Sequence, residues 1–175
     1  MLKNLTICAL VFLSFLNSYA VPNDLKVMYV DIDKVINQSI AGKKVTSQLE
    51  NLNNSNIKKF RQKEDKLAAE EKAIIKQKNI LSKEEFEKKV IILRADIKNF
   101  RNEVNVSKKE LDKKRVEATN KILSNLNPIL SEYSSKNSIS LIIQKKNIVI
   151  GKSNLDITKP ILNLLNAKIK SVKLN

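Results

Sequence analysis

The sequence contains no histidine and no tryptophan, and it has only two glycines and three prolines. Histidine is the usual general base and the commonest metal ligand, so its absence removes most acid–base sites and zinc sites. The two glycines, Gly42 and Gly151, cannot build a Gly-rich loop that cradles a phosphate. The rest of the chain shows no nucleophile elbow and no metal-binding motif. The composition therefore predicts a protein that is not an enzyme and that binds neither cofactor nor metal.

The first twenty residues have the anatomy of a secretory signal peptide. Lys3 supplies the positive start, an apolar run covers residues 5–15, and small residues precede a cleavage point after Ala20. Retention as a membrane anchor is the weaker alternative, because the run is shorter than the ~20 residues that a membrane span needs. Cleavage would also remove Cys8, the only cysteine. The mature chain would then have neither a disulfide nor a thiol nucleophile.

An excess of positive charge is the strongest feature of the composition. Lysine and arginine number 33 against 18 acidic residues, and Lys3 supplies one unit of the resulting +15. The remaining +14 is distributed as −1 on residues 21–42, +9 on residues 43–127 and +6 on residues 128–175. Such a field attracts polyanions and acidic surfaces. Nucleic acid would come first for a cytosolic chain, but an exported protein meets anionic lipid more often.

Residues 43–127 contain neither glycine nor proline, so nothing in them forbids helix. In the second half of this stretch, apolar residues alternate at spacings of four and three, as in the seam of a coiled coil. These residues are Phe86, Val90, Leu93, Ile97, Phe100 and Val104. In the first half, the residues that recur every seven positions are Phe60, Leu67, Ile74 and Leu81. Both halves are predicted to be long helices with a narrow apolar seam.

Residues 81–86, LSKEEF, carry a helix start signal inside this helical stretch. Ser82 followed three residues later by Glu85 is a capping box, which begins a new helix. We therefore predict that the chain reverses near Ser82 and that two helices pack antiparallel. Facing residues should then have position numbers with a constant sum, and the apolar positions mirror each other with a sum of 167. The facing pairs include Val45 with Ile122 and Ile74 with Leu93, whereas Phe60 is expected opposite Ser107.

Some aliphatic residues fall outside the seam of both helices. They are Ile75, Ile91, Ile92 and Val106. A single exposed aliphatic residue is common on protein surfaces and needs no functional explanation. Together, on arms too thin to hold a second core, these residues favour a binding surface.

Strand-forming patterns lie at both ends of the mature chain. Residues 25–32, LKVMYVDI, are predicted as a strand, followed by a short helix capped by Asp33 and a joint at Gly42. Residues 139–144 and 147–150 are predicted as two further strands, and residues 157–170 as an amphipathic helix with Pro160 in its first turn. Three strands and one helix form a marginal core, so we expect oligomerisation.

Taken together, these patterns resemble the Skp/OmpH family of periplasmic chaperones over essentially the whole mature chain. The resemblance rests on the strand KVMYVDIDKVI, on the joint formed by Ser39, Gly42 and Lys43, on the basic hairpin, and on the ending ISLIIQKKNIVIGKSNLDITKPILNLLN. It implies a fold that is mainly α with a small β part, in which a long antiparallel coiled-coil hairpin projects from a small oligomeric β-barrel body. Residues 1–20 would be the signal peptide, residues 21–42 and 128–175 the β-rich oligomerisation body, and residues 43–127 the arm.

The resemblance also implies a function. It is that of an ATP-independent holdase, a homotrimer in the periplasm that encloses unfolded outer-membrane proteins and prevents their aggregation, with no nucleic-acid partner. The four off-seam aliphatic residues would bind the client. Basic residues of the arm would bind anionic lipid or lipopolysaccharide, and the densest cluster of candidates is Lys108, Lys109, Lys113, Lys114 and Arg115. A solvated helix face explains that cluster equally well.

Two other interpretations stay open at this point. The first is a basic nucleic-acid-binding protein, although three tyrosines, five phenylalanines and no tryptophan provide few stacking side chains. The second is an exported structural coiled coil of the cell envelope, anchored if the signal peptide is retained.

Overall fold

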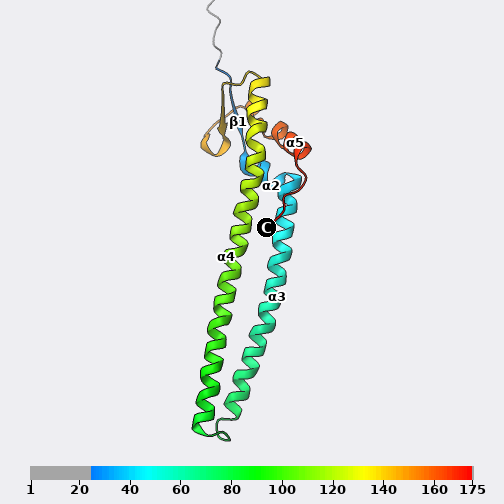
Figure 1. The fold of residues 1–175 in the computed structure, drawn as a ribbon. Coiled ribbons are helices and arrows are strands. Elements are labelled where there is room, and N and C mark those ends of the chain that lie inside the picture. Colours follow the sequence, from blue (N-terminus) through cyan, green and yellow to red (C-terminus); the bar gives the residue numbers. More distant parts are fainter. Residues whose placement is uncertain (1–24, 175) are drawn as a thin grey trace, which may run out of the picture.

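Two long antiparallel helices dominate the computed structural model of the chain, which describes residues 25–174 (Figure 1). Helix α3, Ile40–Lys76, and helix α4, Lys83–Lys136, lie side by side and form an arm. All the short elements gather at the end of the arm opposite its tip. The predicted hairpin is therefore confirmed. The expected cleavage after Ala20 lies outside the described residues.

The tip of the arm has the predicted cap. Ser82 Oγ accepts a hydrogen bond from the backbone N–H of Glu85 at 3.3 Å, and the Glu85 carboxylate accepts one from the backbone N–H of Ser82 at 3.1 Å. These reciprocal bonds begin α4 directly after the turn. They satisfy two of the backbone donors that every helix start leaves without a partner.

At the other end, strand β1, Val27–Val30, pairs in parallel with strand β2, Leu141–Gln144, and Val27 lies opposite Leu141. Helix α5, Thr158–Lys168, packs against β1 and against helix α2, Ile32–Gln38, and short 3₁₀ turns lie at Lys145–Asn147 and Ser153–Leu155. The helix predicted over residues 157–170 is thus confirmed as α5. The largest fully buried apolar side chains are those of Val30, Val35, Ile122, Leu126, Ile161 and Leu165. One core therefore joins both chain ends to the end of the arm opposite its tip. We name the short elements at this end, β1, β2, α2 and α5, the body.

The joint between α2 and α3 differs in detail from the prediction. Asp31, not Asp33, caps α2, and α3 begins at Ile40, so Gly42 lies inside its first turn. Ser39 is fully buried and caps α3 by accepting a hydrogen bond from the Gly42 backbone N–H at 3.0 Å. A Cβ at Gly42 would overlap the backbone carbonyl of Ile36. Glycine is needed here because two helices meet closely, and not because it ends one.

The strand predicted over residues 147–150 is wrong. Residues 145–147 form a 3₁₀ turn, and residues 148–150 take no regular structure. The sheet in residues 25–174 consists of β1 and β2, and one isolated bridge joins Tyr29 to Asp156. The apolar side chains of Val149 and Ile150 are almost fully exposed, at 99% and 91%. A strand needs a neighbouring strand for its backbone hydrogen bonds, and none lies beside this segment. Within residues 25–174, one chain supplies two strands, not the expected three.

Helix α4 continues through Pro128 to Lys136, beyond the point where the composition changes. Proline in a helix interior removes one backbone hydrogen bond and normally bends or breaks the helix. Here Pro128 is exposed, while Leu126 and Ile129 on either side are buried in the core. Their burial holds the last turns of the helix in place.

Candidate functional site

The seam between α3 and α4 is well packed near its two ends. Val45 and Leu49 are buried beside Ala118 and Ile122 near the body, and Ile74 and Leu93 are buried near the tip. In the middle, the seam becomes polar and its contacts run diagonally. Asn56 Nδ2 donates to Ser107 Oγ at 2.8 Å, and the Phe60 ring packs edge-on against Phe100 with centroids 6.2 Å apart. The Phe60 ring therefore contacts Phe100, and the expected position of Phe60 opposite Ser107 stays a prediction.

The sequence explains these diagonal contacts. Seam positions in α3 step by four twice in succession at Leu52, Asn56 and Phe60, where a regular heptad would step by four and then three. Such an insertion locally unwinds the supercoil and rotates the following residues relative to the partner helix. The two phenylalanine rings fill part of the space that results.

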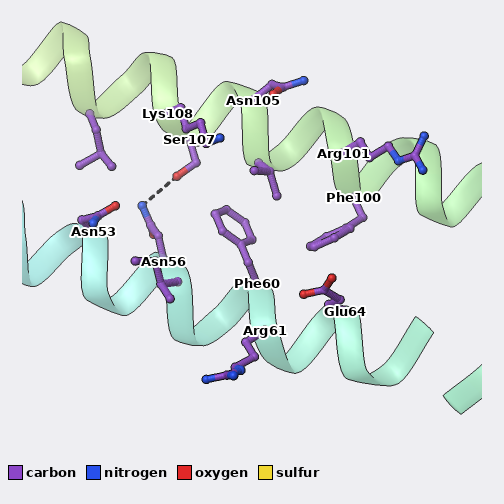
Figure 2. Close-up of a pocket in the computed structure, with 13 residues that line it drawn as sticks. Asn53, Asn56, Phe60, Arg61, Glu64, Phe100, Arg101, Asn105, Ser107 and Lys108 are labelled. Carbon is purple, nitrogen blue, oxygen red and sulfur yellow. Dashed lines mark hydrogen bonds between the residues drawn. The ribbon is translucent and has the colours of Figure 1, made fainter. Parts of the chain in front are cut away.

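A cleft opens at this irregular point, with a volume of about 710 Å³ (Figure 2). Figure 2 shows the rings of Phe60 and Phe100 between the two helices. Leu111 and Val104 add apolar surface, and the exposed Ile57 borders it. The charged residues that line the cleft are Arg61, Glu64, Arg101 and Lys108. We name this feature the mid-arm cleft; it combines an apolar floor with a net charge of +2.

A second groove continues from the mid-arm cleft toward the body. It shares Asn53, Lys108 and Leu111 with the cleft and reaches Arg115 and Thr119 on α4. Both openings therefore lie on the same side of the arm, which we name the grooved flank. The opposite side of the arm is named the second flank.

All four aliphatic residues singled out from the sequence are exposed. The exposed fractions are 61% for Ile75, 64% for Ile91, 58% for Ile92 and 49% for Val106. The structure does not bring them into one patch. Their exposure agrees with the prediction that they lie off the seam, and their role stays a prediction.

Helical spacing assigns these residues to different flanks. Ile75 follows Ile57 by eighteen residues, which is five full turns, and Ile57 lines the mid-arm cleft. Ile91 precedes Asn105, another cleft residue, by two heptads. Ile75 and Ile91 therefore lie on the grooved flank. Ile92 directly follows Ile91, and Val106 directly follows Asn105, so both occupy the next position of the heptad. They lie on the second flank.

The predicted basic cluster is also divided. Lys108 and Arg115 line the grooves. Lys114 is half-buried at the seam, and Lys109 and Lys113 are exposed. Consecutive residues of a helix point in directions 100° apart, so a run in the sequence cannot form one face. Arg115 also contacts the Asp112 carboxylate at 3.2 Å.

The structure shows two features that the sequence patterns did not predict. Ile57, Ile80 and Val116 are exposed apolar residues that were not singled out, and Ile80 at the tip is 81% exposed. The cation Lys63 crosses the seam to Glu103 at 2.6 Å, and this hydrogen bond lowers the pKa of the Glu103 carboxyl, helped by the charges of Lys63 and Lys59. The sequence contains one indication of the Lys63–Glu103 ion pair, because Lys63 occupies a seam position where an apolar residue is expected.

The described residues offer no metal-binding cluster of three or more acidic, histidine or cysteine side chains. Within the same residues, no helix is both long enough and apolar enough to cross a membrane. The candidate site is therefore a surface of the arm with grooves, exposed aliphatic residues and an excess of cations.

This architecture defines a class of protein, in which a long helical hairpin projects from a small sheet made by both chain ends. The profile of the OmpH family, described as "Outer membrane protein (OmpH-like)", matches residues 26–165. The chain belongs to this OmpH-like family.

A solved structure shares the fold. It is the 2.83 Å crystal structure of a candidate outer membrane chaperone (OmpH-like) from Caulobacter crescentus CB15, which superposes with a TM-score of 0.80 at 18% sequence identity. The match covers 85% of this chain and 88% of the Caulobacter chain. Comparison with curated proteins gives no significant match.

Proposed function

We propose that the protein is a periplasmic holdase chaperone, which binds unfolded outer-membrane proteins between its arms without ATP and prevents their aggregation. Family membership and the role named for the Caulobacter relative support a chaperone. The observation that carries the proposal is the arm itself, because its seam uses few apolar residues while other aliphatic side chains stay exposed beside grooves. Together, on an arm too thin to hold a second core, these exposed side chains favour a binding surface.

The physical mechanism is holding by many weak contacts. Each off-seam isoleucine that buries ~40 Å² on a client contributes about 1 kcal/mol at 25 cal/mol/Å². The positive field of the arms attracts acidic segments over longer distances. Several arms that act on one client raise the effective concentration of each contact. The client can therefore stay bound and mobile, and it leaves when a better partner takes it.

We further propose that the active species is a homotrimer whose chain ends form a β-barrel body, with residues 21–42 and 128–175 in the body and residues 43–127 in the arm. The exposed apolar segment at Val149 and Ile150, together with the half-exposed Leu141 of β2, supports this proposal. An apolar segment beside a two-stranded sheet is a natural place for a neighbouring chain to pack.

Anionic lipid or lipopolysaccharide is a second proposed partner of the basic arm. The candidates Lys109 and Lys113 are exposed, and Lys108 and Arg115 line grooves. Lys114, which is half-buried, is the weakest candidate of the five. Vesicle flotation with and without anionic lipid tests this part of the proposal; binding that ignores lipid charge would contradict it.

The client-binding assignment is tested with the double variant Ile91→Ser, Ile92→Ser. Both side chains are exposed in one chain, so oligomeric state and helix content should not change. The variant should suppress aggregation of a urea-unfolded outer-membrane protein less well than the parent, because up to about 2 kcal/mol of apolar contact per arm is lost. Unchanged suppression would reject Ile91 and Ile92 as client contacts.

A further inference from the structure

Helix α4 carries two charged edges with the period of the coiled coil. Four cations stand at steps of seven residues and form the basic edge: Arg94, Arg101, Lys108 and Arg115. Four carboxylates stand two residues after them, also at steps of seven, and form the acidic edge: Asp96, Glu103, Glu110 and Glu117. Relative to the seam positions Leu93, Phe100 and Ser107, these are the two positions that flank a coiled-coil interface on opposite sides.

The two edges lie on different flanks of the arm. Arg101 and Lys108 line the mid-arm cleft and Arg115 lines the adjoining groove, so the basic edge faces the grooved flank. None of the acidic-edge carboxylates lines either opening. Glu103 is bound by Lys63 of α3 at 2.6 Å, which partly neutralises the acidic edge.

The basic edge keeps much of its charge available. Within residues 25–174, Arg94, Arg101 and Lys108 form no ion pair. Glu64 is the one acidic residue that lines the mid-arm cleft, against three cations. Toward the body, Glu50 and Asp112 balance Lys108 and Arg115. The positive field of the grooved flank is therefore strongest at the mid-arm cleft.

We infer that the mid-arm cleft is a subsite for an extended polypeptide segment that carries acidic side chains next to apolar ones. The segment's apolar side chains pack on Phe60, Phe100 and Val104, and its carboxylates lie at Arg61, Arg101 and Lys108. Ile75 and Ile91 continue the apolar surface along the same flank toward the tip. The inference rests on the proposed function and narrows it to one flank of the arm. Of the four candidate client residues, Ile75 and Ile91 would then contact the client, and Ile92 and Val106 would not.

Charge and shape together favour this occupant. An apolar floor inside a rim of cations stabilises carboxylates better than an open surface, because partial exclusion of water strengthens each charge-assisted hydrogen bond. A basic segment would be repelled by the same rim. A purely acidic segment without apolar residues would leave the phenylalanine floor in water.

A matched pair of double variants tests the position of the charges. Arg101→Gln, Lys108→Gln removes two cations from the cleft, and Lys109→Gln, Lys113→Gln removes two exposed cations that line neither groove. Both variants lose the same net charge, so the long-range field falls equally. The probes are a labelled extended peptide with alternating aspartate and apolar residues and its counterpart with lysine in place of aspartate.

The cleft variant should bind the acidic peptide about three- to tenfold more weakly than the parent, the size of two partly exposed ion pairs. The control variant should change binding by less than about twofold, and the lysine peptide should bind neither. Equal losses in the two variants would overturn the inference and leave only a diffuse field.

Photo-crosslinking separates this inference from the proposed function. A photoreactive residue at Asn105, which lines the cleft, should capture an unfolded outer-membrane protein, and one at the exposed Asn99 on the second flank should capture much less. Equal capture, while the parent still suppresses aggregation, would overturn the one-flank inference alone. Failure of the parent to suppress aggregation would overturn the proposed function as well.

Discussion

Gly42 shows how a single residue connects the body to the arm. Its missing side chain lets the first turn of α3 approach the Ile36 carbonyl, while Ser39 Oγ donates to that carbonyl at 2.8 Å and accepts from the Gly42 N–H. The sequence predicted a joint at this glycine. It could not show that the glycine lies inside a helix, because close approach of two backbones depends on the tertiary fold.

Replacing Gly42 with alanine should destabilise the protein. In an ordinary helix this change stabilises by about 0.5–1 kcal/mol. Here the new Cβ meets backbone, which cannot move cheaply, so we expect a loss of about 1–3 kcal/mol. Urea denaturation followed by circular dichroism measures the change, with Ser47→Ala on the exposed face of α3 as the control. A stabilised Gly42→Ala variant would contradict the described joint.

Ser82→Ala should loosen the tip of the arm by about 1 kcal/mol, the usual effect of losing a helix cap. Hydrogen bonds from Ser82 lower the pKa of Glu85. A carboxyl with a lowered pKa stabilises the folded state above its unfolded pKa, and that stabilisation disappears as the pH falls through the folded value. The difference between parent and variant in amide exchange of residues 83–86 should therefore narrow below about pH 4. A difference that is independent of pH would remove Glu85 from the cap.

At the scale of the helices, local patterns predicted most of what is observed. Seam spacing, the capping box and the mirrored apolar positions identified α3, α4 and the turn, because helices depend on contacts close in sequence. The failed strand at residues 147–150 depended on a neighbour far away in the chain or in another chain. The basic edge was visible as Arg94, Arg101, Lys108 and Arg115, but its meaning required the position of the cleft.

The polar residues in the middle of the seam should lower the stability of the arm and keep the mid-arm cleft open for binding. Replacing both Asn56→Val and Ser107→Ala removes a hydrogen-bonded pair without leaving one partner unsatisfied. We expect the arm to gain about 1 kcal/mol from the added apolar burial. The mid-arm cleft should become narrower, and the acidic peptide should bind more weakly. A stabilised variant with unchanged peptide affinity would exclude the cleft as the binding subsite.

For the molecule as a whole, net charge determines how binding responds to salt. The mature chain would carry +14, and attraction between exposed charges is screened over ~8–10 Å near physiological ionic strength. Client affinity should fall as salt rises from low to physiological concentration. Fluorescence titration of a labelled unfolded client measures it, and an affinity that is independent of salt would mean that the excess charge does not contribute.

Stability should depend little on pH between about 6 and 8, because the chain has no histidine. Hydrogen bonds from Lys63 and Lys136 lower the pKa values of Glu103 and Glu132. The stabilisation from these two carboxylates is present above their unfolded pKa and is lost as the pH falls below about 4. The melting temperature, measured by thermal denaturation from pH 8 downward, should stay nearly constant between about pH 8 and 6 and should fall below about pH 4. A transition near pH 6.5 would require a titrating group that the sequence lacks.

We propose that this protein keeps unfolded outer-membrane proteins soluble by enclosing them between its arms, and one measurement tests this claim most directly. It is the mass in solution of the chain that starts at Val21, measured without nucleotide, alone and with a urea-diluted outer-membrane protein. We predict a trimer alone, and with the client one soluble complex that contains three copies of the chain and one client. A client that precipitates to the same extent with and without the protein would contradict the claim.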